Sequence, residues 1–195
     1  MKATGRDVSE IRFHGRGGQG VVTAAKLLAE AAMKEGKYFQ ALPDYGGERM
    51  GAPVRAYTRI SSDPILLHCQ VTEPDIVVVI DPTLIEFVDV TEGLPPEGGV
   101  LVTNTPLTPE EVRKKISFGK GKVAVVNATS IALHTLKRNI PNTPMLGALV
   151  KAAPVVQKKS LIETIRTKLV ATFSPKVAEA NIEAFEKAYQ ECQIG

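Results

Sequence analysis

The sequence predicts an α/β protein with a Rossmann-like, mostly parallel sheet, flanked by helices and carrying an inserted β-hairpin. Short apolar strands alternate with helical patterns, which is typical of a parallel sheet with right-handed crossovers. The run at 75–80 is almost entirely apolar and β-branched, as in a strand covered on both faces. A glycine cluster at 15–20 separates the first predicted strand from the first predicted helix. We expect the 195 residues, 1–195, to form one domain with its core at about 9–190.

The sequence pattern in the first third of the chain predicts strands, one helix and a long loop. Strands are expected at 10–14, 37–42 and 54–60, and a helix at 21–33. Gly36 ends that helix. Three glycines and two prolines within 43–53 predict a loop. A turn at 61–64 followed by the apolar segment 65–71 predicts a β-hairpin that pairs 65–71 with the strand before the turn.

The remainder continues the alternation and ends in helices. Strands are expected at 75–80, 99–104 and 122–127, and helices at 82–90, 109–116 and 130–139. The segment 141–150 turns into an apolar helix in which Gly147 and Ala148 permit close packing, in the core or at a subunit interface. Two further helices close the chain, and Ser174 with Pro175 begins the last of them.

Composition and charge exclude several classes of function. The net charge is +3 and the basic residues are scattered, so we expect no nucleic-acid partner. No apolar run reaches the roughly 18 residues of a membrane span. The two cysteines, Cys69 and Cys192, lie far apart, which suits a reducing cytoplasm. They also argue against an iron–sulfur cluster or a zinc site held by this chain, because such sites need about four clustered ligands. We therefore expect a cytoplasmic protein that binds no metal of its own.

The glycine cluster is the most informative part of the sequence. Its pattern, Gly15-x-Gly17-x-x-Gly20, matches the dinucleotide-binding fingerprint in letters and in context. Unpartnered N–H groups and a positive dipole at a helix N-terminus favour anions. The candidate residues for binding an anion or cofactor are Gly15, Arg16, Gly17, Gly18, Gln19 and Gly20. The alternative is a glycine turn that only packs a helix against the sheet.

Individual residues near this cluster indicate which classes of ligand it could bind. An NAD site needs an acid at the end of the second strand, roughly 20 residues on. Asp44 lies near that place but inside the expected loop, which disfavours NAD. Arg16 suits a phosphate or a partner's carboxylate. Gln19 is either a polar helix-start residue or a hydrogen-bonding group for a ligand or a neighbouring loop. His14, at a strand end, is either a structural histidine or a ligand-facing one.

The loop at 43–53 is the second notable feature. Loops of this length in compact domains are often functional, and Tyr, Arg and Met are favoured at interfaces. We predict contact with another subunit or with a ligand, against the alternative of an ordered loop with an internal Glu48–Arg49 pair. The candidate residues are Asp44, Tyr45, Gly46, Glu48, Arg49, Met50 and Gly51.

The segment 14–20 followed by 43–53 resembles the gamma subunit of 2-oxoacid:ferredoxin oxidoreductases. The later segment from Asn142 to Leu149 resembles the pyruvate:ferredoxin oxidoreductase (pyruvate synthase) branch. The resemblance covers about residues 9–190, and two motifs in order are more specific than a lone glycine fingerprint. Gly18 and Gly47 stand where relatives often show another small residue, which leaves the assignment intact.

The resemblance implies a subunit of an enzyme complex and no catalytic residue in this chain. Such complexes oxidatively decarboxylate pyruvate or a related 2-oxoacid, reduce ferredoxin and deliver the acyl group to coenzyme A. It implies alpha, beta and delta partner subunits, with thiamine diphosphate on the alpha and beta chains and iron–sulfur clusters on the delta chain. For Gly15–Gly20, contact with coenzyme A and a mainly architectural role are both open.

Two other classes of function remain as alternatives. One is a free-standing Rossmann-like nucleotide-binding protein, such as an NAD-dependent reductase, and the other is a non-enzymatic small-ligand sensor. If the chain works only in an assembly, we expect Met50, Met145 and Leu146 to lie in exposed apolar patches.

Overall fold

The computed structural model describes residues 8–44, 51–116 and 118–195. These residues form a seven-stranded sheet in the order β2-β3-β1-β4-β5-β6-β7. The strands are β1 (Val8–Arg16), β2 (Tyr38–Asp44), β3 (Pro53–Ser61), β4 (Ile76–Val79), β5 (Val100–Asn104), β6 (Lys122–Val126) and β7 (Gln193–Ile194).

The direction of the strands confirms the predicted α/β class. β1, β4, β5 and β6 pair in parallel. β3 is antiparallel to both β1 and β2, so β2 runs in the same direction as β1. β7 is antiparallel to β6 at the far edge. Five strands therefore share one direction, and the inserted antiparallel pair is β2 with β3.

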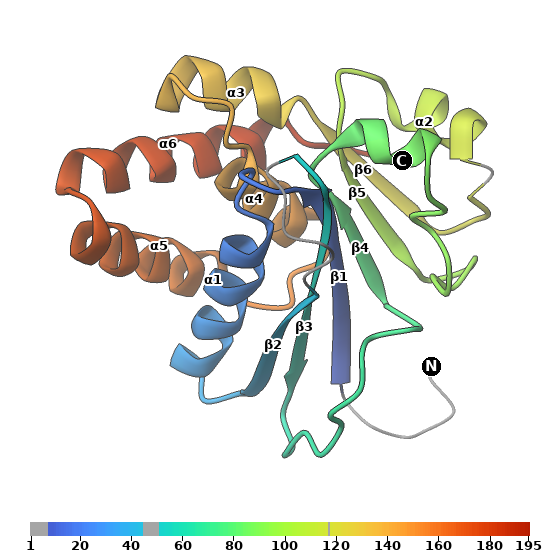
Figure 1. The fold of residues 1–195 in the computed structure, drawn as a ribbon, viewed down its shortest axis with the longest axis horizontal. Helices are drawn as coiled ribbons and strands as arrows, with labels where there is room; N and C mark the ends of the chain where they lie inside the picture. The colour runs from blue at the N-terminus through green and yellow to red at the C-terminus, as the bar shows by residue number, and fades with distance from the viewer. Residues whose placement is uncertain (1–7, 45–50, 117) are drawn as a thin grey trace.

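Helices cover both faces of the sheet (Figure 1). On one side lie α1 (Val21–Lys34), α3 (Ala128–Leu136), α4 (Asn142–Ala152), α5 (Lys158–Thr172) and α6 (Pro175–Glu191). On the other lie the short 3₁₀ helix η1 (Pro82–Glu86) and α2 (Pro109–Ile116). The larger core contains Phe13, Leu28 and Phe185, whereas the smaller core, beneath η1 and α2, contains Leu84 and Val112. None of the helices in these described segments combines the length and apolar character that a membrane crossing requires.

Close helix packing explains the small residues of 141–150. A Cβ atom on Gly147 of α4 would lie 2.3 Å from the carbonyl oxygen of Phe185 in α6, so the two backbones touch at that point. Met145 and Leu146 are fully buried in the same helix. The segment therefore belongs to the core of this chain, and the expectation that these two side chains lie in an exposed patch is wrong. Met50 lies outside the described residues.

The predicted hairpin between 54–60 and 65–71 is wrong. β3 pairs with β1 along one edge and with β2 along the other, so neither edge is left for the segment 65–71. That segment is instead held by side chains. Gln40 Nε2 donates to the Leu67 carbonyl oxygen at 2.8 Å, and Arg59 Nη1 donates to the Cys69 carbonyl oxygen at 2.8 Å.

Several boundaries also differ from the prediction. The helix expected at 82–90 is the single 3₁₀ turn η1, which begins where the Asp81 side chain accepts a hydrogen bond from the Thr83 backbone N–H. The helix expected at 130–139 is α3, which begins two residues earlier because Asn127 caps it through the Ser130 N–H. The capping of α6 by Ser174 is confirmed, since its side chain accepts from the Val177 N–H at 3.3 Å. The two-residue strand β7 was not predicted.

Candidate functional site

The glycine cluster lies at the carboxyl end of β1, beside the carboxyl end of β4. These strands are neighbours, but the chain passes from β1 to α1 on one face of the sheet and from β4 to η1 on the other (Figure 1). In open α/β sheets, ligands bind in the crevice that such a change of face creates. We call Gly15–Gly20 the glycine corner.

Two glycines of the corner are required by close contacts. A Cβ atom on Gly15 would lie 2.6 Å from Val21 Cγ2, so the strand end and the helix start approach too closely for a side chain. Gly20 has φ +78°, in the left-handed region that favours glycine. A Cβ atom there would lie 2.4 Å from Asn142 Nδ2, at the start of α4. The corner therefore brings the start of α1 against the start of α4.

The polar side chains of the corner face the end of β4. Gln19 Nε2 donates to Asp81 Oδ2 at 2.6 Å, and Gln19 Oε1 accepts from the Arg16 backbone N–H at 2.8 Å. Arg16 Nη2 donates to Thr83 Oγ1 at 2.9 Å, and Arg16 Nε lies 3.4 Å from Asp81 Oδ2. Of the alternatives for Gln19, the structure shows the hydrogen bond to a neighbouring loop.

Asp81 is the centre of this network. Burial acts to raise the pKa of its carboxyl, but hydrogen bonds from Thr83 and Gln19 and the positive charge of Arg16 outweigh burial and lower it. Asp81 is therefore ionised at neutral pH. Its charge compensates that of Arg16, so the guanidinium is a weak site for an external anion.

The second candidate loop joins the corner through its backbone. The Gly17 N–H donates to the Ala52 carbonyl oxygen at 2.9 Å, and the Gly51 N–H donates to the Gly17 carbonyl oxygen at 3.2 Å. Arg16 Nη1 also donates to the Gly51 carbonyl oxygen at 3.1 Å. The structure thus brings Gly51 to the corner. The other loop candidates Tyr45, Gly46, Glu48, Arg49 and Met50 lie outside the described residues.

Asp44 is engaged away from the corner. Its Oδ2 accepts from Arg55 Nε at 3.1 Å and from the Tyr57 hydroxyl at 3.2 Å. It ends β2, which β3 separates from β1. A dinucleotide site needs its acid on the strand beside β1, so the position of Asp44 further disfavours NAD.

A groove opens on the other side of the corner, toward the helices. It has a volume of about 490 Å³ and is lined by the starts of α1 and α4, the α3–α4 connection, and α5 and α6. Gly18, Gly20 and Asn142 form one wall, and Phe173 and Val177 add apolar surface. We call it the helical groove.

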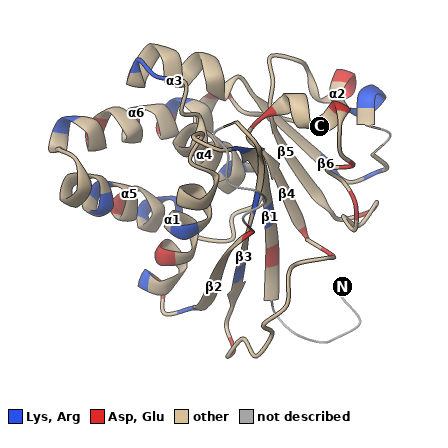
Figure 2. Ribbon diagram, in the orientation of Figure 1, with Lys and Arg blue, Asp and Glu red and all other residues tan. Residues whose placement is uncertain are grey.

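The charges that line the helical groove are all positive. They are Lys137 and Arg138, just after α3, and Lys176 at the start of α6. Among the described residues that line the groove, none is acidic. Figure 2 shows these basic segments at the same end of the helical layer. The groove therefore has a positive rim beside the uncapped N-terminus of α1, where Gly20 offers no capping side chain.

Sequence reasoning missed Asp81 and Thr83 in the network, and Lys137, Arg138, Asn142 and Lys176 in the groove. Asp81 directly follows a buried strand, and this position would have placed it at the carboxyl edge of the sheet. Asn142, Lys137 and Lys176 come from segments more than 100 residues after the corner, and no local pattern links them to it.

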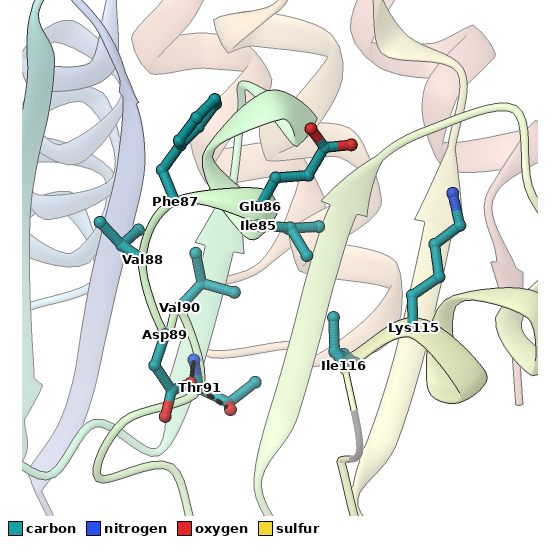
Figure 3. Close-up of a pocket in the computed structure, with 9 residues that line it drawn as sticks. All are labelled: Ile85, Glu86, Phe87, Val88, Asp89, Val90, Thr91, Lys115 and Ile116. Carbon is teal, nitrogen blue, oxygen red and sulfur yellow. Dashed lines mark hydrogen bonds between the residues drawn. The ribbon is translucent and has the colours of Figure 1, made fainter.

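A further hollow of about 360 Å³ lies between η1, the segment after it, and the end of α2 (Figure 3). It contains none of the predicted site residues. Figure 3 shows Ile116 and Lys115 on one side, and the dashed bonds of Asp89 to Thr91 on the other.

Known proteins resemble this chain along almost its whole length. The family model described as pyruvate ferredoxin/flavodoxin oxidoreductase matches residues 10–191. The "pyruvate/ketoisovalerate oxidoreductases common subunit gamma" of Pyrococcus abyssi is 52% identical over 185 residues, 95% of this chain and 97% of that protein. The crystal structure of pyruvate oxidoreductase subunit PORC from Thermotoga maritima has a TM-score of 0.86 at 44% identity, and the match covers 97% of this chain and 99% of that one. The gamma subunit of keto/oxoacid ferredoxin oxidoreductase from Geobacter sulfurreducens has a TM-score of 0.74 at 27% identity, with 95% and 99% covered.

Proposed function

Because the chain belongs to the pyruvate ferredoxin/flavodoxin oxidoreductase family, we propose that it is the gamma subunit of a complex with alpha, beta and delta partners. The complex oxidatively decarboxylates pyruvate or a related 2-oxoacid, forms an acyl-coenzyme A and reduces ferredoxin. Full-length similarity to gamma subunits supports this assignment over a free-standing NAD-dependent reductase.

We assign thiamine diphosphate and the iron–sulfur clusters to the companion subunits. A cluster needs about four thiolate ligands, and this chain has two cysteines. Cys69 is exposed on the segment after β3, whereas Cys192 is buried at the end of α6. The residues of this chain therefore do not fit a cluster, and no step of electron transfer is assigned to them.

The helical groove is the observation that supports contact with coenzyme A. The pyrophosphate and phosphate groups of coenzyme A are anionic, and the groove joins a helix N-terminus to three cationic side chains. The apolar wall formed by Phe173 and Val177 suits the less polar part of such a ligand. We therefore assign anion contact to Gly18, Gly20 and the groove cations rather than to Arg16, whose charge Asp81 compensates.

Purification from the native source tests the subunit assignment. We expect a tagged chain to co-purify with larger partners, and the purified complex to reduce ferredoxin when a 2-oxoacid is added. The isolated chain is expected to show neither this activity nor NAD binding. An isolated chain that binds NAD and oxidises a substrate alone would contradict the assignment.

Titration of coenzyme A into the assembled complex tests the groove. The triple variant Lys137→Gln/Arg138→Gln/Lys176→Gln removes the groove cations, and we expect its Kd to rise by roughly tenfold or more. Lys114→Gln, which removes an exposed cation from α2 on the other side of the sheet, is the matched control and should leave Kd unchanged. An unchanged Kd in the triple variant would show that coenzyme A binds elsewhere.

A further inference from the structure

A separate cleft lies on the polar side of β1, beside the segment that follows η1. Its volume is about 370 Å³, and its lining includes Arg12 and His14 from β1, Arg55 from β3, and Val88. Side chains alternate along a strand, so Arg12 and His14 point away from the main core that Ile11 and Phe13 enter. In Figure 3, Val88 lies on the side of its segment that is nearer β1.

Arg12 is a buried cation with an unused donor. Its side chain belongs to a residue that is only 4% exposed. Arg12 Nη2 donates to the carbonyl oxygens of Val90 at 3.2 Å and Glu92 at 2.5 Å, but Nε has no hydrogen-bond partner. None of the ion pairs formed among the described residues includes Arg12. A buried guanidinium with an unpaired N–H is strongly stabilised by a hydrogen bond to a carboxylate or to another acceptor oxygen.

His14 offers a second unused group two residues along the same strand. It is 5% exposed, and its Nε2 has no hydrogen-bond partner. Burial, followed by the charges of Arg12 and Arg55, lowers the pKa of His14 to about 3. The ring is therefore neutral at neutral pH, and in the tautomer with a proton on Nε2 it is a donor. Two buried polar atoms on one strand face thus lack partners in one cleft.

The other charges of the cleft leave this pair free for a ligand. Asp44 is engaged by Arg55 and Tyr57. Asp89 and Glu92 also line the cleft and attract Arg12, but both are exposed, so water and salt weaken their interaction with it. Arg12 lies buried at the base, where its interaction with an anion is screened much less.

We propose that this cleft binds a single carboxylate group, which accepts hydrogen bonds from Arg12 Nε and His14 Nε2. The carboxylate belongs either to a small organic acid or to an Asp or Glu side chain that another chain inserts. The same two donors serve both sources, and the inference does not depend on the coenzyme A assignment.

Nitrogen-detected NMR of the ¹⁵N-labelled chain tests the proposal. The Arg12 Nε–H and His14 Nε2 resonances are followed during titration with sodium acetate, with sodium chloride at equal ionic strength as the reference. They are then followed when the companion subunits are added without acetate. A saturable shift with acetate identifies a free acid as the ligand, and a shift only on assembly identifies an inserted side chain.

Two Arg→Lys variants, one in the cleft and one outside it, test whether the response depends on the Arg12 Nε–H donor. Arg12→Lys keeps the charge but lacks the Nε–H donor, and we expect at least a tenfold weaker response. Arg113→Lys is the control, because Arg113 also donates to backbone carbonyl oxygens, those of Gly119 and Gly195, but outside the cleft. If Arg12→Lys fails to fold, the wild-type resonances decide alone. Resonances that move in neither arm, or that move equally in Arg12→Lys, would overturn the proposal.

Discussion

Replacing Gly20 by alanine measures how tightly the glycine corner is fitted to α4. The residue has φ +78°, and an L-residue in this region costs about 1–2 kcal/mol. The added Cβ would lie 2.4 Å from Asn142 Nδ2, 2.8 Å from Cγ and 3.2 Å from Cβ. Rotation of the Asn142 side chain relieves the first two contacts but not the third, so Asn142 must move away by a few tenths of an ångström. Overpacking of this kind costs about 1–3 kcal/mol.

The two contributions together predict that Gly20→Ala lowers the free energy of unfolding by roughly 2–5 kcal/mol. For a chain of 195 residues, each kcal/mol shifts Tm by about 2–4 °C, so the loss of Tm is about 4–20 °C. Urea unfolding followed by circular dichroism, together with calorimetry, measures both quantities.

Gly36→Ala is the matched control for the backbone contribution. Gly36 has a similar φ of +72°, but nothing lies within 4 Å of an added Cβ. We expect it to cost only about 1–2 kcal/mol. If the two variants lose equal stability, the contact between Gly20 and Asn142 adds no cost beyond the backbone contribution, and the argument from close approach fails.

Three further predictions concern the core and the titratable groups. Gly147→Ala drives a Cβ to within 2.3 Å of the Phe185 carbonyl oxygen, so we expect a loss of about 1–3 kcal/mol in urea unfolding; full stability would contradict the close α4–α6 packing. Burial and two neighbouring guanidinium groups lower the pKa of His14 from 6.5 to about 3. Between pH 3 and pH 6.5, the His14 ring is therefore protonated in the unfolded chain but neutral in the folded one. Stability is then complete above pH 6.5 and is lost as pH falls, by roughly 2 kcal/mol at pH 5, and His14→Gln should flatten this limb of a pH–stability curve. Burial raises the pKa of Cys192 to about 11, so a thiol reagent at pH 8 should modify exposed Cys69 rapidly and Cys192 only on unfolding; equal rates would refute the burial.

Local patterns were sufficient for most of the sheet and for the position of the glycine corner. The run at 75–80 predicts a covered strand because a strand that is buried on both faces must consist of apolar residues. The cluster at 15–20 predicts a strand-to-helix turn because a turn with close contacts requires residues with small side chains or none. The prediction of β4 and of the start of α1 therefore agrees with the structure.

The errors arose where the outcome depends on distant parts of the chain. The segment 65–71 has strand-like residues, but β1 and β2 occupy both edges of β3, and competition between partners is invisible in a local window. The two residues of β7 are too few to form a pattern, and they become a strand only because β6 presents a free edge.

The candidate site shows the same division. The glycines were identified from their spacing, and two of them, Gly18 and Gly20, have the positive φ that favours glycine. A hydrogen bond from Gln19 to a neighbouring loop was one of the alternatives, but its partner Asp81 and the Arg16 partner Thr83 were not identified, because both lie more than 60 residues away. The groove cations also come from distant helices, so only the assembled fold places them beside Gly20.

The short helix α4 has a mechanical consequence. Its first residue abuts the turn before α1, and its middle touches the main chain of α6 with no side chain between them. The contact between α4 and α6 joins main chain to main chain, so a tilt of α6 would carry α4 with it. We therefore expect that a companion protein pressing on the outer surface of α6 would displace α4 and, through the Asn142 side chain, shift the contact with Gly20.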